Sequence, residues 1–195
     1  MSFINYDNKE INFKVVYVGP GLSGKTTSLE YIYIKTKGKS KAKMVRQEAN
    51  ERTLFFDFIP LFLSEVNGFK TRFHAYTVPG QVLYEDSRNL ILKGVDGIVF
   101  VADSAIEQME ANIRSLEGLK ESLQDQGVNL EKFPIVFQYN KRDAKHAANL
   151  EEMRKLLNTF GAPDFESIAT KGQGVFEAFK ELAKKVLADF VKTGA

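Results

Sequence analysis

The residues with the clearest chemistry form a glycine-rich run that ends in a lysine and a threonine. Residues 19–26 read Gly-Pro-Gly-Leu-Ser-Gly-Lys-Thr and match the pattern G-x-x-x-x-G-K-[ST] at every fixed position. Glycines allow successive backbone N–H groups to turn toward one centre, where they can surround phosphate oxygens. An apolar segment at residues 15–18 precedes the run and a helix-like segment follows it. This context favours a phosphate-binding loop over an ordinary glycine-rich turn.

Each position of such a loop has an expected role. The Lys25 amine would reach the β- and γ-phosphates, and the Thr26 hydroxyl would be a ligand of Mg²⁺. The helix that begins near Lys25 adds the positive end of its dipole. The residues expected around the phosphates are Gly19, Gly21, Leu22, Ser23, Gly24, Lys25, Thr26 and Thr27. The loop alone leaves open which nucleotide binds and whether it is hydrolysed.

A second motif, N-K-R-D at residues 140–143, follows an apolar run at residues 133–139. It fits N-K-x-D at the carboxyl end of a strand, where ligands bind in open α/β sheets. The Asp143 carboxylate can accept from N1–H and the exocyclic amine of guanine, and the Lys141 stem can lie along the base. Asn140 can tie this loop to residues 19–26. A polar turn is the alternative for the motif alone, but the two motifs together predict guanine binding.

The rest of the chain alternates strand-like and helix-like segments. Apolar or alternating segments occupy residues 3–6, 11–18, 53–63, 69–78, 95–102, 133–139 and 165–169, and helical periodicity occupies 26–36, 106–123, 150–160 and 175–191. Asn67-Gly68 predicts a hairpin. We therefore expect an α/β fold of the P-loop NTPase type, with a mixed, mostly parallel sheet, helices on both faces and an extra short N-terminal strand.

Length and composition narrow the classes of protein. The 195 residues predict one domain, with a strand and turn at 1–10 and the nucleotide-binding part at 11–193. The net charge of +2 does not favour nucleic acid as a partner, and the absence of cysteine excludes disulfides and thiol catalysis. No apolar run reaches transmembrane length and no lipidation motif is present, so we expect a cytoplasmic protein without its own membrane anchor. Lysines at every second position of 35–43 fit a solvated loop or a basic patch for an acidic partner or anionic lipid.

Beyond the two motifs, the chain resembles the Ras-like small GTPases from Ile11 to the last helix, and within them the bacterial branch that governs gliding motility and cell polarity. The resemblance rests on residues 19–26, 52–58, 68–73, 77–81, 92–97 and 140–143. It implies a switch that binds GTP or GDP with Mg²⁺ and hydrolyses GTP slowly. It also implies a roadblock-fold dimer as activator of hydrolysis and effectors that recognise the GTP state, and it leaves open an exchange factor and recruitment to the cell poles.

The resemblance also assigns residues outside the two motifs. Thr53 would be a ligand of Mg²⁺, the Gly80 N–H would meet the γ-phosphate, and Gln81 would orient the attacking water. Arg52 would act as an arginine finger in cis, with a surface arginine as the alternative. The expected catalytic residues are thus Gln81, Arg52 and Lys25. The backbone N–H of Ala169 could in addition donate to the guanine O6.

One position departs from the pattern of the family. Switch II usually begins with an aspartate that holds a Mg²⁺-bound water, and this chain has Thr77 there. Asp57 is the candidate to supply the missing charge. The expected ligands of the metal are then Thr26, Thr53 and Asp57. The alternative for Asp57 is a position on an exposed strand face. Two rival functions remain open: a P-loop kinase, and a module that holds GTP without turning it over.

Two further features have structural interpretations. Asp103 and Ser104 follow a buried strand, and we expect them to cap the long helix at residues 106–123. His74 lies within a strand-like segment, where packing or a partner contact is favoured over catalysis. With His146 it does not suggest a metal site.

Overall fold

The computed structural model describes residues 3–36, 45–46, 57–66, 68–78 and 85–193. In this part of the chain eight strands form one sheet in the order β3-β4-β5-β2-β6-β7-β8, with β1 paired to β2. The strands are β1 (Phe3–Asn5), β2 (Glu10–Val18), β3 (Val45–Arg46), β4 (Asp57–Val66), β5 (Phe69–Thr77), β6 (Gly97–Asp103), β7 (Ile135–Asn140) and β8 (Asp164–Glu166).

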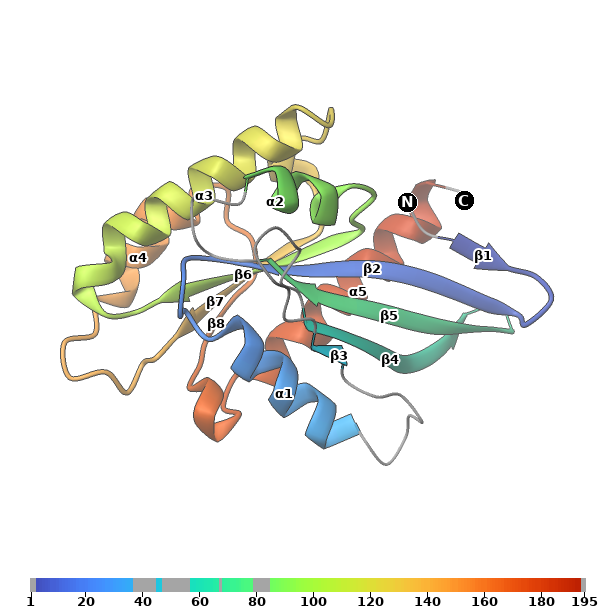
Figure 1. Ribbon diagram of the computed structural model, residues 1–195, viewed down its shortest axis with the longest axis horizontal. Helices are drawn as coiled ribbons and strands as arrows, with labels where there is room; N and C mark the ends of the chain where they lie inside the picture. The colour runs from blue at the N-terminus through green and yellow to red at the C-terminus, as the bar shows by residue number, and fades with distance from the viewer. Residues whose placement is uncertain (1–2, 37–44, 47–56, 67, 79–84, 194–195) are drawn as a thin grey trace.

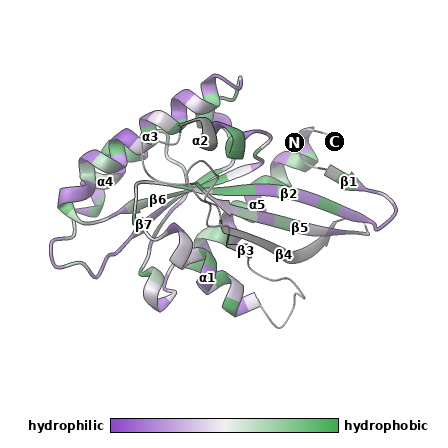
Figure 2. Cartoon of the chain, in the orientation of Figure 1, coloured by the Kyte–Doolittle hydropathy of each residue, from purple (hydrophilic) through white to green (hydrophobic). Residues whose placement is uncertain are grey.

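Helices cover both faces of this sheet (Figure 1). They are α1 (Lys25–Thr36), α2 (Glu85–Leu92), α3 (Met109–Gln124), α4 (Leu150–Leu157) and α5 (Val175–Thr193), with short 3₁₀ turns η2 (Ile106–Gln108), η3 (Leu130–Lys132) and η4 (Ala169–Lys171). Figure 2 shows hydrophobic and hydrophilic segments alternating along α3 and α4, as expected for helices that bury one side. None of the described helices is long and apolar enough to cross a bilayer.

Strand direction follows the predicted topology. The five neighbours from β5 to β8 pair in parallel, whereas the β4–β5 hairpin, β3 and β1 pair antiparallel. The β4–β5 ladder is irregular between Phe62 and Ser64, and Gly68 in its turn has a φ of 80°. The predicted mixed, mostly parallel sheet, the hairpin and the extra N-terminal strand are therefore confirmed.

Strand alternation divides the core into two layers. In β2, Val15 and Tyr17 face α1 and α5, and Val16 and Val18 face the side covered by α2, α3 and α4. All four side chains are buried. Such two-sided burial is the reason that the central strands read as continuous apolar runs in the sequence.

Three features of the sequence prediction differ from the structure. The strand predicted at residues 165–169 is displaced, because β8 ends at Glu166 and Ala169 begins η4 instead. The chain turns there so that the Ala169 N–H can donate to the Asn140 side chain, 2.9 Å away. The helix predicted to reach residue 160 ends at Leu157, where the Asn158 amide bonds both backbone groups of Ala162. Helix α2 and strand β3 were not predicted.

Candidate functional site

The glycine-rich loop connects β2 to α1 and requires glycine at two positions. Gly19 and Gly24 have φ values of 149° and 101°, where side chains are strained. A Cβ on Gly24 would lie 2.2 Å from the Asn140 Nδ2 atom, and one on Gly19 would lie 2.1 Å from the Val101 carbonyl oxygen. The loop backbone is therefore packed directly against β6 and β7, which holds its N–H groups in place.

Lys25, the first residue of α1, places its amine inside this loop. The Nζ atom donates to the carbonyls of Gly19, at 2.8 Å, and Pro20, at 2.6 Å. The residue is only 7% exposed, and burial lowers the pKa of its amine to about 8. Two neutral carbonyls leave the charge of this desolvated cation unneutralised, so the arrangement fits an anion such as a phosphate.

The buried amine makes the stability of the nucleotide-free protein depend on pH. The Lys25 pKa is about 8 in the fold and about 10.4 in the unfolded chain, so the folded state binds fewer protons between these values and stability should rise with pH there. The difference corresponds to about 3 kcal/mol at most. Urea unfolding between pH 7.5 and 9.5 should show this rise in the parent protein, whereas Lys25→Met should lack it. Equal pH slopes for the two would contradict the low pKa.

Asn140 joins the loop to the second motif, as predicted. Its amide nitrogen donates to the Ser23 carbonyl at 2.7 Å, and its amide oxygen accepts from the Ala169 N–H at 2.9 Å and the Ser167 hydroxyl at 3.1 Å. The residue is buried. The Asn140 side chain, at the end of β7, thus fixes the glycine-rich loop and the η4 segment relative to each other.

A hollow of about 360 Å³ lies between these three segments. Its lining combines residues of the glycine-rich loop and α1 with the N-K-x-D loop and residues 168–170, namely Leu22, Gly24, Thr27, Asn140, Lys141, Asp143, Ala144, Ile168, Ala169 and Thr170. This volume is in the range of ligand pockets. A larger hollow, about 600 Å³, lies elsewhere between Phe13, Val186 and Phe190. We favour the smaller one because both sequence motifs line it.

The lysine of the N-K-x-D motif is paired with Asp103, the last residue of β6. Lys141 has a φ of 63°, and its Nζ lies 2.5 Å from the Asp103 Oδ2 atom. The Asp103 side chain is 3% exposed, and its other oxygen accepts from the Ala105 N–H. The prediction that Asp103 and Ser104 cap the long helix is wrong, because η2 intervenes and the residue that caps α3 is Gln108, without a side-chain bond.

The position of Asp103 at a strand end is a signal in the sequence for its pair with Lys141. Asp103 and Asn140 are register partners at the carboxyl ends of β6 and β7. Charged residues at the ends of neighbouring parallel strands meet at one edge of the sheet. The β6 end therefore belongs to the site.

The residues predicted to act on the γ-phosphate fall outside the described part of the chain. Arg52, Thr53, Gly80 and Gln81 lie outside the described residues, and for Asp57 only the backbone, paired with Arg46 in the β3–β4 ladder, is described. Thr77 is buried at the end of β5, opposite Tyr17. Within the described ranges no group of three histidine, aspartate or glutamate side chains is placed to hold a metal ion.

His74 is not part of this site. It lies in β5, and its Nε2 atom is 2.8 Å from the Asn12 side-chain oxygen. Burial, ahead of the charge of Arg72, lowers the pKa of its imidazole. His74 is half-buried in β5, away from the residues that line the hollow.

The fold, the glycine-rich loop and the N-K-x-D loop together define a P-loop protein of the small GTPase class. Residues 2–186 match the model of the ADP-ribosylation factor family, and the chain belongs to this family. It is 58% identical over 195 residues to the mutual gliding-motility protein MglA of Myxococcus xanthus, covering 100% of both chains. It is 29% identical over 154 residues to human ADP-ribosylation factor-like protein 4A, covering 75% of this chain and 66% of that protein.

Membership of this family indicates which class of ligand the protein binds and which class of reaction it catalyses. Small GTPases of this family bind guanine nucleotide with Mg²⁺ and hydrolyse GTP, so the chain is a Ras-like GTP-binding protein. The P-loop kinase alternative does not fit this family.

Proposed function

We propose that this protein is a GTP/GDP switch in bacterial gliding motility or cell polarity, and that it hydrolyses GTP slowly until an activating partner binds. The observation that carries the nucleotide part is the hollow lined by both motifs. The motility part is supported by the name of the relative that is 58% identical over the whole chain. We further propose that it acts in the cytoplasm and is recruited to the cell poles by its partners.

The described residues fit a guanine nucleotide at this site. The glycines at positive φ and the buried Lys25 amine fit the phosphates, with Thr26 next along α1 for the metal. Asp143 at the rim of the hollow, 3.5 Å from Lys171, fits the guanine edge, and the Lys141 stem fits its face. The Ala169 N–H already donates to Asn140, so its proposed bond to the guanine O6 would be a shared one.

The residues that would act on the γ-phosphate come from the sequence alone. We propose that Gln81 orients the attacking water, that Arg52 neutralises charge on the transferring phosphoryl group, and that Thr53 and Gly80 sense the γ-phosphate. Their loss of contact after hydrolysis would release both switch segments, the one that carries Thr53 and the one that carries Gly80 and Gln81. Asp57 would complete the metal set in place of the carboxylate that Thr77 lacks.

The partners follow from the same resemblance. We propose a roadblock-fold dimer as the activator of hydrolysis and effectors that bind the GTP state. An exchange factor would complete the cycle. The alternative function, a module that holds GTP without turnover, draws its support from the buried Thr77.

Single-turnover GTP hydrolysis, with and without a roadblock-type activator, tests the proposal. We expect Arg52→Ala and Gln81→Leu to lower the stimulated rate by about 10³-fold or more, since a positioned arginine contributes about 10³–10⁵. Arg114→Ala is the matched control, because Arg114 makes an exposed ion pair with Glu110 on α3. Full stimulated turnover in both switch variants would refute their catalytic roles. No stimulated turnover in the parent protein would favour the holding module.

A further inference from the structure

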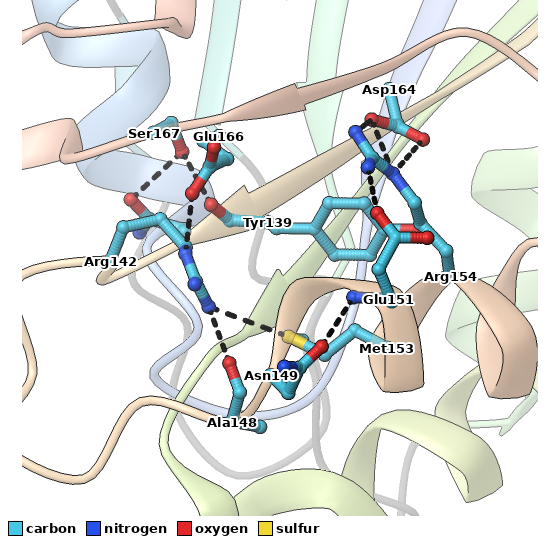
Figure 3. A network of polar contacts seen from close by, with 11 residues as sticks. Tyr139, Arg142, Ala148, Asn149, Glu151, Met153, Arg154, Asp164, Glu166 and Ser167 are labelled. Atoms are coloured by element: carbon cyan, nitrogen blue, oxygen red, sulfur yellow. Dashed lines mark hydrogen bonds and ion pairs between the residues drawn. The ribbon is translucent and has the colours of Figure 1, made fainter.

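The third residue of the N-K-x-D motif, Arg142, turns away from the base hollow. It is absent from the residues that line the hollow, unlike its neighbours Lys141 and Asp143. Figure 3 shows its guanidinium between Glu166, from β8, and two residues near α4: Ala148, just before the helix, and Met153, within it. In this orientation Arg142 would not contact a base in the hollow. It could affect the base only through the residues that it holds in place.

Arg142 bonds two other segments through its side chain and its backbone. The Nε atom donates to Glu166 Oε2 at 2.9 Å, and a terminal nitrogen donates to the Ala148 carbonyl at 2.8 Å and lies 3.9 Å from the Met153 sulfur. The backbone N–H donates to the Ser167 carbonyl at 3.2 Å. The side chain is 19% exposed. Such a planar group with several fixed donors can make all of these bonds at once, which lysine cannot.

The bonds to Glu166 and Ser167 connect the two walls of the hollow from outside. The bond to the Ala148 carbonyl instead ties the loop that carries Asp143 to the chain just before α4. One wall is the loop that begins at Asn140, and the other is the segment 168–170 that follows Glu166 and Ser167. Asn140 connects the same walls from inside. The loop between them contains Lys141 at a positive φ, a conformation that is costly and persists only when its surroundings hold it. Without the outer connection, Asp143 would lose one of the constraints on its position.

We propose that Arg142 is a positioning residue that holds the loop carrying Asp143 and thereby sets the lifetime of bound guanine nucleotide. The inference rests on the proposed function of the hollow as the guanine site. The side-chain bonds of Arg142 to Glu166 and to the Ala148 carbonyl are expected to contribute unequally to holding the loop. Glu166 is 54% exposed, and exposed ion pairs contribute little, whereas the bond to the Ala148 carbonyl is partly buried and involves a charged donor.

The dissociation rate of GDP from the full-length protein measures this role. We expect Arg142→Met to raise the rate about tenfold, because hydrogen bonds to charged groups are worth about that factor or more. Arg142→Lys should fall between Arg142→Met and the parent protein, and Glu166→Gln should change the rate by less than about threefold. Arg114→Met is the control and should leave the rate unchanged. An unchanged rate in Arg142→Met overturns the inference.

A double-mutant cycle separates positioning from a general loss of stability. In an Asp143→Asn background no base carboxylate is left to position, so adding Arg142→Met should change GDP dissociation by less than about twofold. A full tenfold effect in that background would overturn the positioning role. A parent protein that does not bind GDP would instead refute the proposed function, and the inference with it. Release that is slower in Arg142→Lys than in the parent protein also counts against the inference.

Discussion

Lys25→Met is expected to lower the affinity for GDP and GTP at least about 100-fold. The Lys25 amine is the one cation that the structure places inside the glycine-rich loop, among the residues it describes, and it is bonded there to two neutral carbonyls. Phosphate oxygens entering the loop would meet a buried charge that has already lost its water. Removing one member of a buried ion pair costs about 3–5 kcal/mol, which corresponds to about two to four powers of ten in affinity.

The matched control for this variant is Lys120→Met, on the exposed side of α3. It makes the same chemical change at a solvated lysine, so its effect on affinity should stay below about twofold. Isothermal titration of each variant with GDP in the presence of Mg²⁺ gives the comparison. Near-parental affinity of Lys25→Met would mean that the phosphates do not lie in this loop.

Local signals explain the parts of the fold that the sequence predicted. The Asn67-Gly68 pair predicted the β4–β5 hairpin because that turn needs a residue with positive φ, and Gly68 has one. The apolar runs of β2, β6 and β7 predicted buried parallel strands because both of their faces are covered. Helix α2 gave no comparable signal, since it is short and, of the four α2 residues whose burial is described, only Ile91 and Leu92 are part of the core.

Tertiary packing explains the parts of the site that the sequence did not predict. The positions of Asn140 and Asp143 followed from a motif, but the partner of Lys141 depends on which strand lies beside β7. That strand is β6, and its last residue is Asp103. Arg142 is a variable position in the motif, and its bonds to Glu166 and Ala148 arise only once β8 and α4 are in place. Spacing along one segment carries no information about such contacts.

Thr77 is a residue for which the sequence and the structure each supply part of the information. Its identity departs from the family pattern in the sequence, and the structure places it buried at the end of β5, beside the strand that leads into the glycine-rich loop. A buried hydroxyl there removes one negative charge that the metal site of the family usually has close by. Any replacement must come from the segments around it, which is why Asp57, at the first position of β4, is the residue to test.

Asp143→Asn is expected to change the base preference of the site from guanine to xanthine. The carboxylate at the rim of the hollow can accept two hydrogen bonds from the guanine edge, and bonds to charged groups contribute about 1.5–3 kcal/mol each. In Asp143→Asn one of these bonds is lost and the other no longer has a charged acceptor, which together correspond to about 100-fold or more in GDP affinity. Competition between GDP and xanthosine diphosphate measures the change, with Asp189→Asn, on the exposed side of α5, as the control.

The change of preference toward xanthine follows from the hydrogen-bonding groups of residue 143 and of the base. An asparagine amide has one oxygen that accepts and one nitrogen that donates, so its nitrogen would face the exocyclic amine of guanine, donor against donor. Xanthine has a carbonyl at that position and would accept from the same nitrogen. A site that is built to pair a substrate group rejects the analogue that leaves buried groups unpaired. If Asp143→Asn weakened both nucleotides equally, Asp143 would support the loop and would not read the base.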